Sequence, residues 1–140
     1  MNRSAMTASA TLAGLLLAMP ATAMSMANLP PEQMQGPVAY RTGGVGHDEA
    51  AAMQRESSRY PLTLEFVKHA TPKDEYLANI DVTIRKADGG TEASLVSDGP
   101  FLLARLPAGK YQIVASDNGM TKTRDVVIAA NKPERLVFDW

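Results

Sequence analysis

Three consecutive side chains with acid/base chemistry lie in the stretch "RTGGVGHDEAAAMQ", residues 41–54. They are His47, Asp48 and Glu49. A second histidine is His69, and hydroxyl nucleophiles follow the stretch at Ser57 and Ser58. An imidazole, a carboxylate and a hydroxyl are the groups that nucleophilic hydrolysis requires. One hypothesis is therefore a small envelope hydrolase, or an accessory subunit of one, that uses the His-Asp-Glu triplet.

The spacing of these residues does not fit a metal or phosphate site. A zinc site needs three or four ligands, and the two histidines lack the paired spacing of His-Glu-x-x-His. A phosphate loop of the Walker type needs Lys followed by Ser or Thr after its last glycine, and neither follows Gly46. Carboxylates at this position would instead bind the free amides of a helix start and repel an anion. We therefore expect no catalytic residue, no metal and no cofactor here.

The same stretch is typical of a turn followed by a helix. Glycines permit the backbone angles of a tight turn, Ala50 and Met53 are spaced for one helix face, and Pro61 ends the run. The sequence thus predicts a glycine turn and a short helix over residues 41–61, with His47 or Asp48 as the N-cap. Exposed glycine amides beside a histidine could contact a partner. The candidate interaction residues are Gly43, Gly44, Gly46, His47 and Asp48.

The first residues have the pattern of a secretory signal peptide. One positive charge at Arg3 precedes an apolar run over residues 12–19, which a proline and the small-residue pattern "ATA" follow. The apolar run is shorter than the about 20 residues of a membrane-spanning helix. We expect residues 1–23 to be a signal peptide that is cleaved after Ala23, with Ala27 as the alternative position. The mature protein would then be periplasmic, or fully secreted.

Charge and composition limit the partners of the protein. The sequence has 14 Lys and Arg against 15 Asp and Glu, a net charge of −1. Such a surface does not attract nucleic acid or anionic lipid in general. Cysteine is absent, so we expect neither disulfides nor a lipid anchor. Residues 24–40, "MSMANLPPEQMQGPVAY", are rich in proline and polar residues without apolar periodicity, which predicts a flexible linker.

After Pro61 the apolar residues alternate. "LTLEFVK" and "NIDVTI" each place apolar side chains on one face and polar ones on the other, as half-buried strands do. Asn118-Gly119, between two alternating runs, is a strong signal for a hairpin with a type I′ turn. The last run would point Leu136, Phe138 and Trp140 inward. Residues 62–140 therefore predict an antiparallel two-sheet sandwich of about seven strands.

The second half of the chain resembles a known family. The stretches "NIDVTI", "SDGPFLLARLPAGKYQIVAS" and "DNGMTKTRDVVIA" are similar to the carboxypeptidase regulatory-like domain. The matching positions are Asp98, Gly99, Phe101, Leu106, Pro107, Gly109 and Tyr111. More narrowly, the chain is similar to short exported proteobacterial proteins that carry this domain. The resemblance covers roughly residues 62–140 and implies an Ig-like, transthyretin-like β-sandwich without implying an activity.

The motif also predicts local structure. Pro107 and Gly109 suit a tight connection between strands, and Tyr111 can bury its ring while its hydroxyl reaches a backbone partner. Pro100 departs from the family pattern between glycine and phenylalanine, which indicates a strand that begins late or lies at a sheet edge.

These observations favour a mainly β, exported binding module over an enzyme. Its strand edges and loops would contact an envelope protein or a glycan, and an exposed edge strand would allow a homodimer. The alternating aromatic residues at the end of the sequence also occur in outer-membrane β-barrels, so a barrel fragment is a further alternative. The strands are short for that class, whose strands have about 9–11 residues.

Overall fold

The computed structural model describes residues 29–140, so the expected signal peptide and residues 24–28 of the expected linker lie outside the described residues. The described chain forms ten strands, one α-helix and a short 3-10 turn. In chain order they are β1 (Gln33–Gln35), β2 (Val38–Gly43), α2 (His47–Glu56), the turn η1 (Ser57–Arg59), β3 (Leu62–Lys68), β4 (Glu75–Tyr76), β5 (Ile80–Lys86), β6 (Thr91–Ser97), β7 (Phe101–Arg105), β8 (Gly109–Asp117), β9 (Met120–Ile128) and β10 (Glu134–Asp139).

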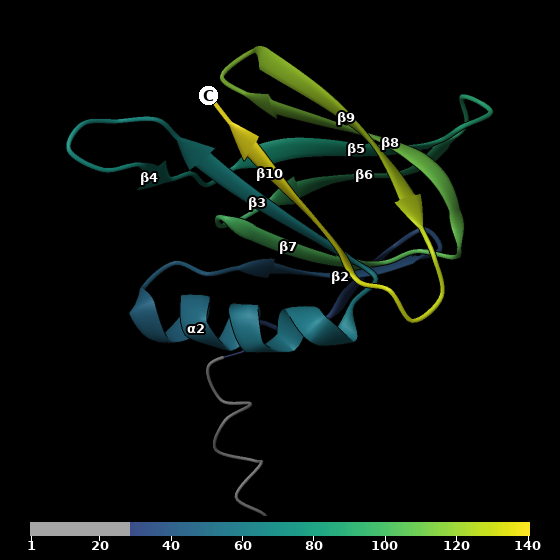
Figure 1. Cartoon of the computed structure of the whole chain (residues 1–140), viewed down its shortest axis with the longest axis horizontal. Coiled ribbons are helices and arrows are strands. Elements are labelled where there is room, and N and C mark those ends of the chain that lie inside the picture. The colour runs from purple at the N-terminus through teal and green to yellow at the C-terminus, as the bar shows by residue number, and fades with distance from the viewer. Residues whose placement is uncertain (1–28) are drawn as a thin grey trace, which may run out of the picture.

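The strands form two sheets. Sheet A has the order β1-β2-β7-β3-β10, with the short β4 beside β3, and sheet B has the order β6-β5-β8-β9. In Figure 1 the sheets lie one above the other, and α2 lies on the side of sheet A that faces away from sheet B. The chain is therefore mainly β, with two sheets and one helix, as the sequence predicts.

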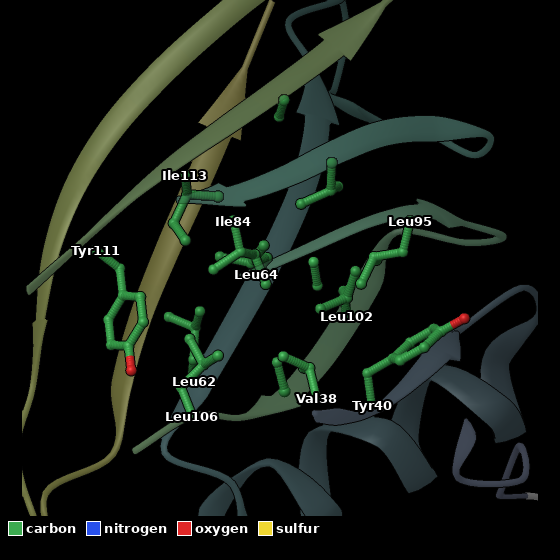
Figure 2. Close-up of a cluster of buried hydrophobic side chains, with 14 of the residues drawn as sticks. Val38, Tyr40, Leu62, Leu64, Ile84, Leu95, Leu102, Leu106, Tyr111 and Ile113 are labelled. Atoms are coloured by element: carbon green, nitrogen blue, oxygen red, sulfur yellow. The ribbon is translucent and has the colours of Figure 1, made fainter. Parts of the chain in front are cut away.

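The space between the sheets holds the larger hydrophobic core. Alternate residues of β3, β5 and β8 point into it, because side chains alternate across a strand. Figure 2 shows this cluster, whose labelled members are Val38, Tyr40, Leu62, Leu64, Ile84, Leu95, Leu102, Leu106, Tyr111 and Ile113. The predicted inward faces of "LTLEFVK" and "NIDVTI" are thus confirmed.

The strand count differs from the expected seven because the sequence patterns did not predict β1, β2 and β4. Residues 33–40 of the expected flexible linker instead lie in an antiparallel hairpin of β1 and β2. In β2, Val38 and Tyr40 are buried in the main core, so this segment is held by burial despite its polar neighbours. β4 has two residues and is too short to show any periodicity.

The sandwich is not entirely antiparallel, which corrects a second expectation. β10 pairs in parallel with β3, from Glu134 opposite Leu62 to Asp139 opposite Val67. β2 and β3 also run in the same direction, since both are antiparallel to the intervening β7. A parallel relation requires a crossover connection, and α2 provides it between β2 and β3.

A second, smaller core lies between α2 and the outer face of sheet A. Met53 of the helix and Tyr60 after it pack with Phe101 and Leu103 of β7, and all four are buried. Because Leu102 and Ala104 of the same strand are buried in the larger core, β7 is covered on both faces. β7 is therefore a central strand, and the expectation of an edge position is wrong, whereas its start at Phe101, after Pro100, agrees with the expected late start.

β3 is also buried on both faces, although its sequence predicts a half-buried strand. Thr63 and Glu65 on its outer face are only 4% and 8% exposed. The Glu65 carboxylate forms an ion pair with Arg135 of the neighbouring β10. The outer face of β3 can be buried despite its polar residues, because adjacent elements supply partners for them.

Side chains close the open side of the sandwich between β9 and β10. Arg124 donates to the Val137 carbonyl at 3.2 Å, and the Trp140 indole donates to the Met120 carbonyl at 2.9 Å. Phe138 is fully buried, as predicted, whereas Leu136 and Trp140 are only partly buried. The indole must remain near the rim to reach its carbonyl partner, which explains why Trp140 is not fully inward.

Two local predictions are confirmed. β8 and β9 form the expected hairpin, from Gly109 opposite Ile128 to Asp117 opposite Met120. Its turn residues have positive φ angles, 49° at Asn118 and 82° at Gly119, as a type I′ turn requires.

The ring of Tyr111 is buried, and its hydroxyl donates to the Pro107 carbonyl at 2.8 Å. We expect Tyr111→Phe to lower the free energy of unfolding by about 1 kcal/mol, because the Pro107 carbonyl loses the hydroxyl that donates to it. Tyr111→Ala should lower it by about 3 kcal/mol, because the whole ring is lost from the core. Urea unfolding measures both, with Tyr76→Phe as the control because the Tyr76 side chain is exposed. An equal effect of the two phenylalanine variants would contradict this role of the Tyr111 hydroxyl.

Candidate functional site

The loop between β2 and α2 brings the five candidate interaction residues together, with Gly43 and Gly44 buried and Gly46, His47 and Asp48 exposed. An open pocket of about 650 Å³ lies on one side of the loop, and its lining includes Pro30 and Asp98. A second pocket of about 350 Å³ lies on the other side, and its lining includes Ala50 and Tyr76. The residues that line both pockets are Gly46 and His47. The loop is therefore a ridge between two hollows.

Close packing fixes the glycines of this loop. Gly43 and Gly44 have φ angles of 158° and 101°, which favour glycine. A Cβ at Gly44 would overlap with the Phe101 ring, and a Cβ at Gly43 would overlap with the Glu49 carboxylate. Gly46 has a φ of 89° but open space around it. The first two glycines are thus required by contact and by backbone angle, and Gly46 by backbone angle alone.

The start of the helix differs from the expected cap. The N-cap is Gly46, which has no side chain to bind the first amides, rather than His47 or Asp48. Glu49 in the first turn instead accepts a hydrogen bond from the Gly44 amide at 2.9 Å. That amide is therefore not free for a partner, which corrects the expectation of exposed glycine amides at this position. The carboxylate ties the loop to the helix.

Asp98 and Gly99 of the family-like motif support the same loop from the end of β6. The Thr42 hydroxyl donates to the Asp98 carboxylate at 3.2 Å. Gly99 lies directly against the backbone of Gly43, and a Cβ there would overlap with the Gly43 carbonyl. Asp98 and Gly99 of the motif thus fix the position of the loop that forms the candidate site.

The other motif residues belong to the fold rather than to the site. Phe101 is in the smaller core between α2 and sheet A, and Leu106 is in the larger core. The Pro107 carbonyl accepts a hydrogen bond from the Tyr111 hydroxyl. Gly109 has a φ of 157° and lies against the Tyr111 ring. Trp140 packs on the rim of the main core, as described above.

A cluster around Tyr60 connects the segment before β1 to sheet A, and the sequence patterns did not reveal it. The Tyr60 hydroxyl donates to the Glu32 carboxylate and accepts a hydrogen bond from the Arg41 guanidinium at 2.8 Å. Arg105 lies over the Tyr60 ring, 4.2 Å from its centre, and also pairs with Glu32. Burial and the Glu32 carboxylate raise the pKa of Tyr60, while the tyrosine hydrogen bond lowers the pKa of Glu32. The cluster holds the chain beside the larger pocket, which Pro30 lines.

His69 has two carboxylate partners, one five residues away and one 70 residues away in the sequence. Its Nε2 lies 2.6 Å from Asp139 of β10, and its Nδ1 lies 3.2 Å from Asp74 in the segment before β4. The carboxylates contact opposite ring nitrogens and therefore do not converge on one point, as ligands of one metal ion would. Within residues 29–140, no three metal-ligating side chains form a cluster that could hold an ion.

Four of the candidate hydrolytic groups, Ser57, Ser58, Glu49 and His69, have other partners. The Ser57 and Ser58 hydroxyls donate to the carbonyls of Gln54 and Arg55 in the last turn of α2. Glu49 binds the Gly44 amide, and the His69 ring lies between two carboxylates. A nucleophile, a base and an orienting group are not joined by hydrogen bonds among these residues.

Gly44 and Gly46 both have positive φ angles, and substitutions at these two positions separate backbone strain from side-chain overlap. We expect Gly46→Ala to lower the free energy of unfolding by about 1 kcal/mol, because only the backbone is strained. Gly44→Ala should lower it by about 3 kcal/mol, because the new methyl group also overlaps with the Phe101 ring. Thermal and urea unfolding of the two variants provide the comparison. Equal losses would show that the close packing of Gly44 on Phe101 is wrong.

Asp139 and Asp74 raise the pKa of His69 above its ordinary value of 6.5. Both carboxylates only accept hydrogen bonds, so both ring nitrogens must carry a proton to donate. The stabilisation is therefore fully present below about pH 6.5 and is lost as the pH rises through the raised pKa. His69 also lowers the pKa of Asp139, so the contribution of Asp139 is lost as the pH falls through that lowered value.

We expect the difference in melting temperature between wild type and His69→Gln to be greater at about pH 6 than at about pH 9. Thermal melts across this range measure it. The control His47→Gln should keep the pH dependence of the wild type, because His47 contacts neither carboxylate. A His69→Gln variant with an unchanged pH profile would contradict the assignment.

Comparisons with known proteins assign no family to this chain. No family model matches the sequence, and no functionally described protein is significantly similar to it. The α-helix of residues 29–140 is too short to pass through a lipid bilayer.

Proposed function

We propose that this chain is a non-enzymatic binding module of the cell envelope that contacts its partner through the loop of residues 43–48. The observation that carries this proposal is the position of Val45. Its side chain is 64% exposed although the glycines on both sides of it have constrained backbone angles. An apolar side chain that a fixed loop presents to solvent is a suitable contact point for a partner.

The loop is held from three directions. Glu49 binds it from the helix, Phe101 packs under it from β7, and Asp98 with Gly99 supports it from the end of β6. Binding to such a loop loses little conformational entropy, because the contact surface exists before the partner arrives. This preorganisation supports binding at the loop.

The two pockets offer different chemistry to a partner. The larger one contains the carboxyl groups of Asp48, Glu49 and Asp98, and the smaller one contains Ala50 and the half-exposed ring of Tyr76. A protein surface with a basic side chain next to an aliphatic or aromatic one matches this arrangement. We therefore propose an envelope protein as the partner at the loop.

Export and family membership form part of the same proposal. The signal-peptide pattern of residues 1–23 supports a periplasmic location, with secretion as the alternative. The positions Asp98, Gly99, Pro107, Gly109 and Tyr111 support a transthyretin-like domain of the carboxypeptidase regulatory-like type. Two facing sheets are compatible with such a domain, in which loops at the ends of the sheets commonly carry binding residues.

Photocrosslinking from two exposed valines tests the proposal. A photoreactive amino acid at Val45 should capture a discrete envelope protein in intact cells, whereas the same group at Val96 on the outer face of sheet B should not. Val96 is the matched control because it is also exposed, on β6. Purified wild-type protein should compete for this partner, and Val45→Asp should compete at least about tenfold less well, since a charge replaces the apolar contact. Identical products from both positions would refute the proposed contact surface.

A further inference from the structure

Sheet B has a second candidate binding site, at the end of its outer face near the β5–β6 turn. Figure 1 shows sheet B on the opposite side of the molecule from α2. A pocket of about 440 Å³ lies there, lined by residues of the adjacent strands β5, β8 and β9. This volume falls in the range of about 300–1,000 Å³ that small-molecule sites occupy. The site is separate from the loop of residues 43–48, and its test does not depend on that loop.

Strand register places charged side chains in adjacent rows of this site. Arg85 lies opposite Gln112, and Gln112 lies opposite Asp125, so these three form one row across β5, β8 and β9. Lys110 and Val127 form the next row, which lies two residues away on the same face. Diagonal neighbours of this kind are about 7–8 Å apart, close enough for two long cationic side chains to meet one ligand.

The cations of the pocket differ in their pairing. Lys86 binds the Glu92 carboxylate at 3.1 Å, whereas Arg85 and Lys110 have no acidic partner within ion-pair distance among residues 29–140. A register shift in the β5–β6 pairing occurs between Ile84 and Arg85, and such bulges often redirect a side chain near a binding site. Two unpaired cations that converge on one pocket favour an anionic group in the ligand.

The rest of the lining limits the class of that ligand. Asp125 can accept hydrogen bonds, and the Gln112 amide between it and Arg85 can both donate and accept. The exposed side chain of Val127 adds an apolar surface beside Lys110. A ligand that has a carboxylate, neighbouring hydroxyl groups and an apolar face would satisfy all of these groups.

We propose that this pocket binds an acidic sugar, with the carboxylate of a uronic acid on Arg85 and Lys110 and its hydroxyl groups on Gln112 and Asp125. The ring face of the sugar packs on Val127. Arg85 can hold the carboxylate through two parallel hydrogen bonds, and Lys110 adds a point charge. An acidic peptide fits less well, because Asp125 would repel its further carboxylates while it accepts the hydroxyl groups of a sugar.

Titration of the full mature protein with digalacturonate, followed by calorimetry and amide NMR, tests the proposal. We expect saturable binding with shifts at residues 85, 110, 112 and 127. Arg85→Gln and Lys110→Gln should each weaken binding by about tenfold, because each removes a charged hydrogen bond to the carboxylate. The control Lys73→Gln should bind like wild type, because Lys73 is an exposed lysine that lies outside this pocket. Unchanged melting temperatures would show that the variants remain folded.

Three ligand controls decide between the possible contacts. The dimethyl ester of digalacturonate lacks the charges and should bind at least about tenfold more weakly. Inorganic phosphate should not displace digalacturonate at equal concentration, and the peptide Gly-Glu-Glu-Gly should bind more weakly than the sugar. Equal binding of the ester, displacement by phosphate, preference for the peptide, or no saturable binding of digalacturonate would each overturn the proposal.

Discussion

The double burial of β7 is the constraint on which the arrangement of this protein depends. Its sequence Phe-Leu-Leu-Ala-Arg has no polar residue before Arg105, so neither face of the strand can be left in water. Leu102 and Ala104 are buried against sheet B, and Phe101 and Leu103 are buried against the helix. A two-sheet sandwich alone would cover only the first pair. The helix is therefore required by the composition of one strand.

The shape of the candidate site follows from that requirement. Because α2 packs on Phe101, the chain must pass from the end of β2 to the start of the helix directly over this ring. Only glycine at Gly44 leaves space for it, and the loop then has few ways to place Val45 except toward solvent. The glycine pattern that resembles a ligand loop is thus explained first by packing. Exposure of an apolar side chain at its apex is a consequence of the same packing, and it makes binding at this loop chemically reasonable.

The sequence predicted the parts of the fold that depend on local periodicity. Alternation in β3, β5 and β8, the Asn118-Gly119 turn and the Tyr111 hydroxyl contact all involve neighbours in sequence or a single inward face. β2 was missed because its burial depends on pairing with β7, which lies about 60 residues away in sequence. The parallel partner of β3 was missed for the same reason, since register between distant strands leaves no local pattern.

The candidate site was predicted only in part, for related reasons. The residue types of the loop indicated a turn and a contact surface, but the N-cap was placed wrongly because Glu49 reaches back to Gly44 instead of leaving the cap to Asp48. The pairs Tyr60–Glu32 and His69–Asp139 join residues that are 28 and 70 positions apart. Such pairs become neighbours only after the sheets are formed, so the spacing of the residues in the sequence does not predict these contacts.

Charge pairing differs between the outer faces of the two sheets. On the outer face of sheet A, Glu65 is only 8% exposed, and its carboxylate pairs with Arg135. Partly buried charges need such partners, because desolvation without pairing is costly. On sheet B, Arg85, Lys110 and Asp125 are solvated and their charges need no internal partner. The uncovered sheet thus keeps charged groups that an external ligand can use, while the covered sheet uses its charges to complete the fold.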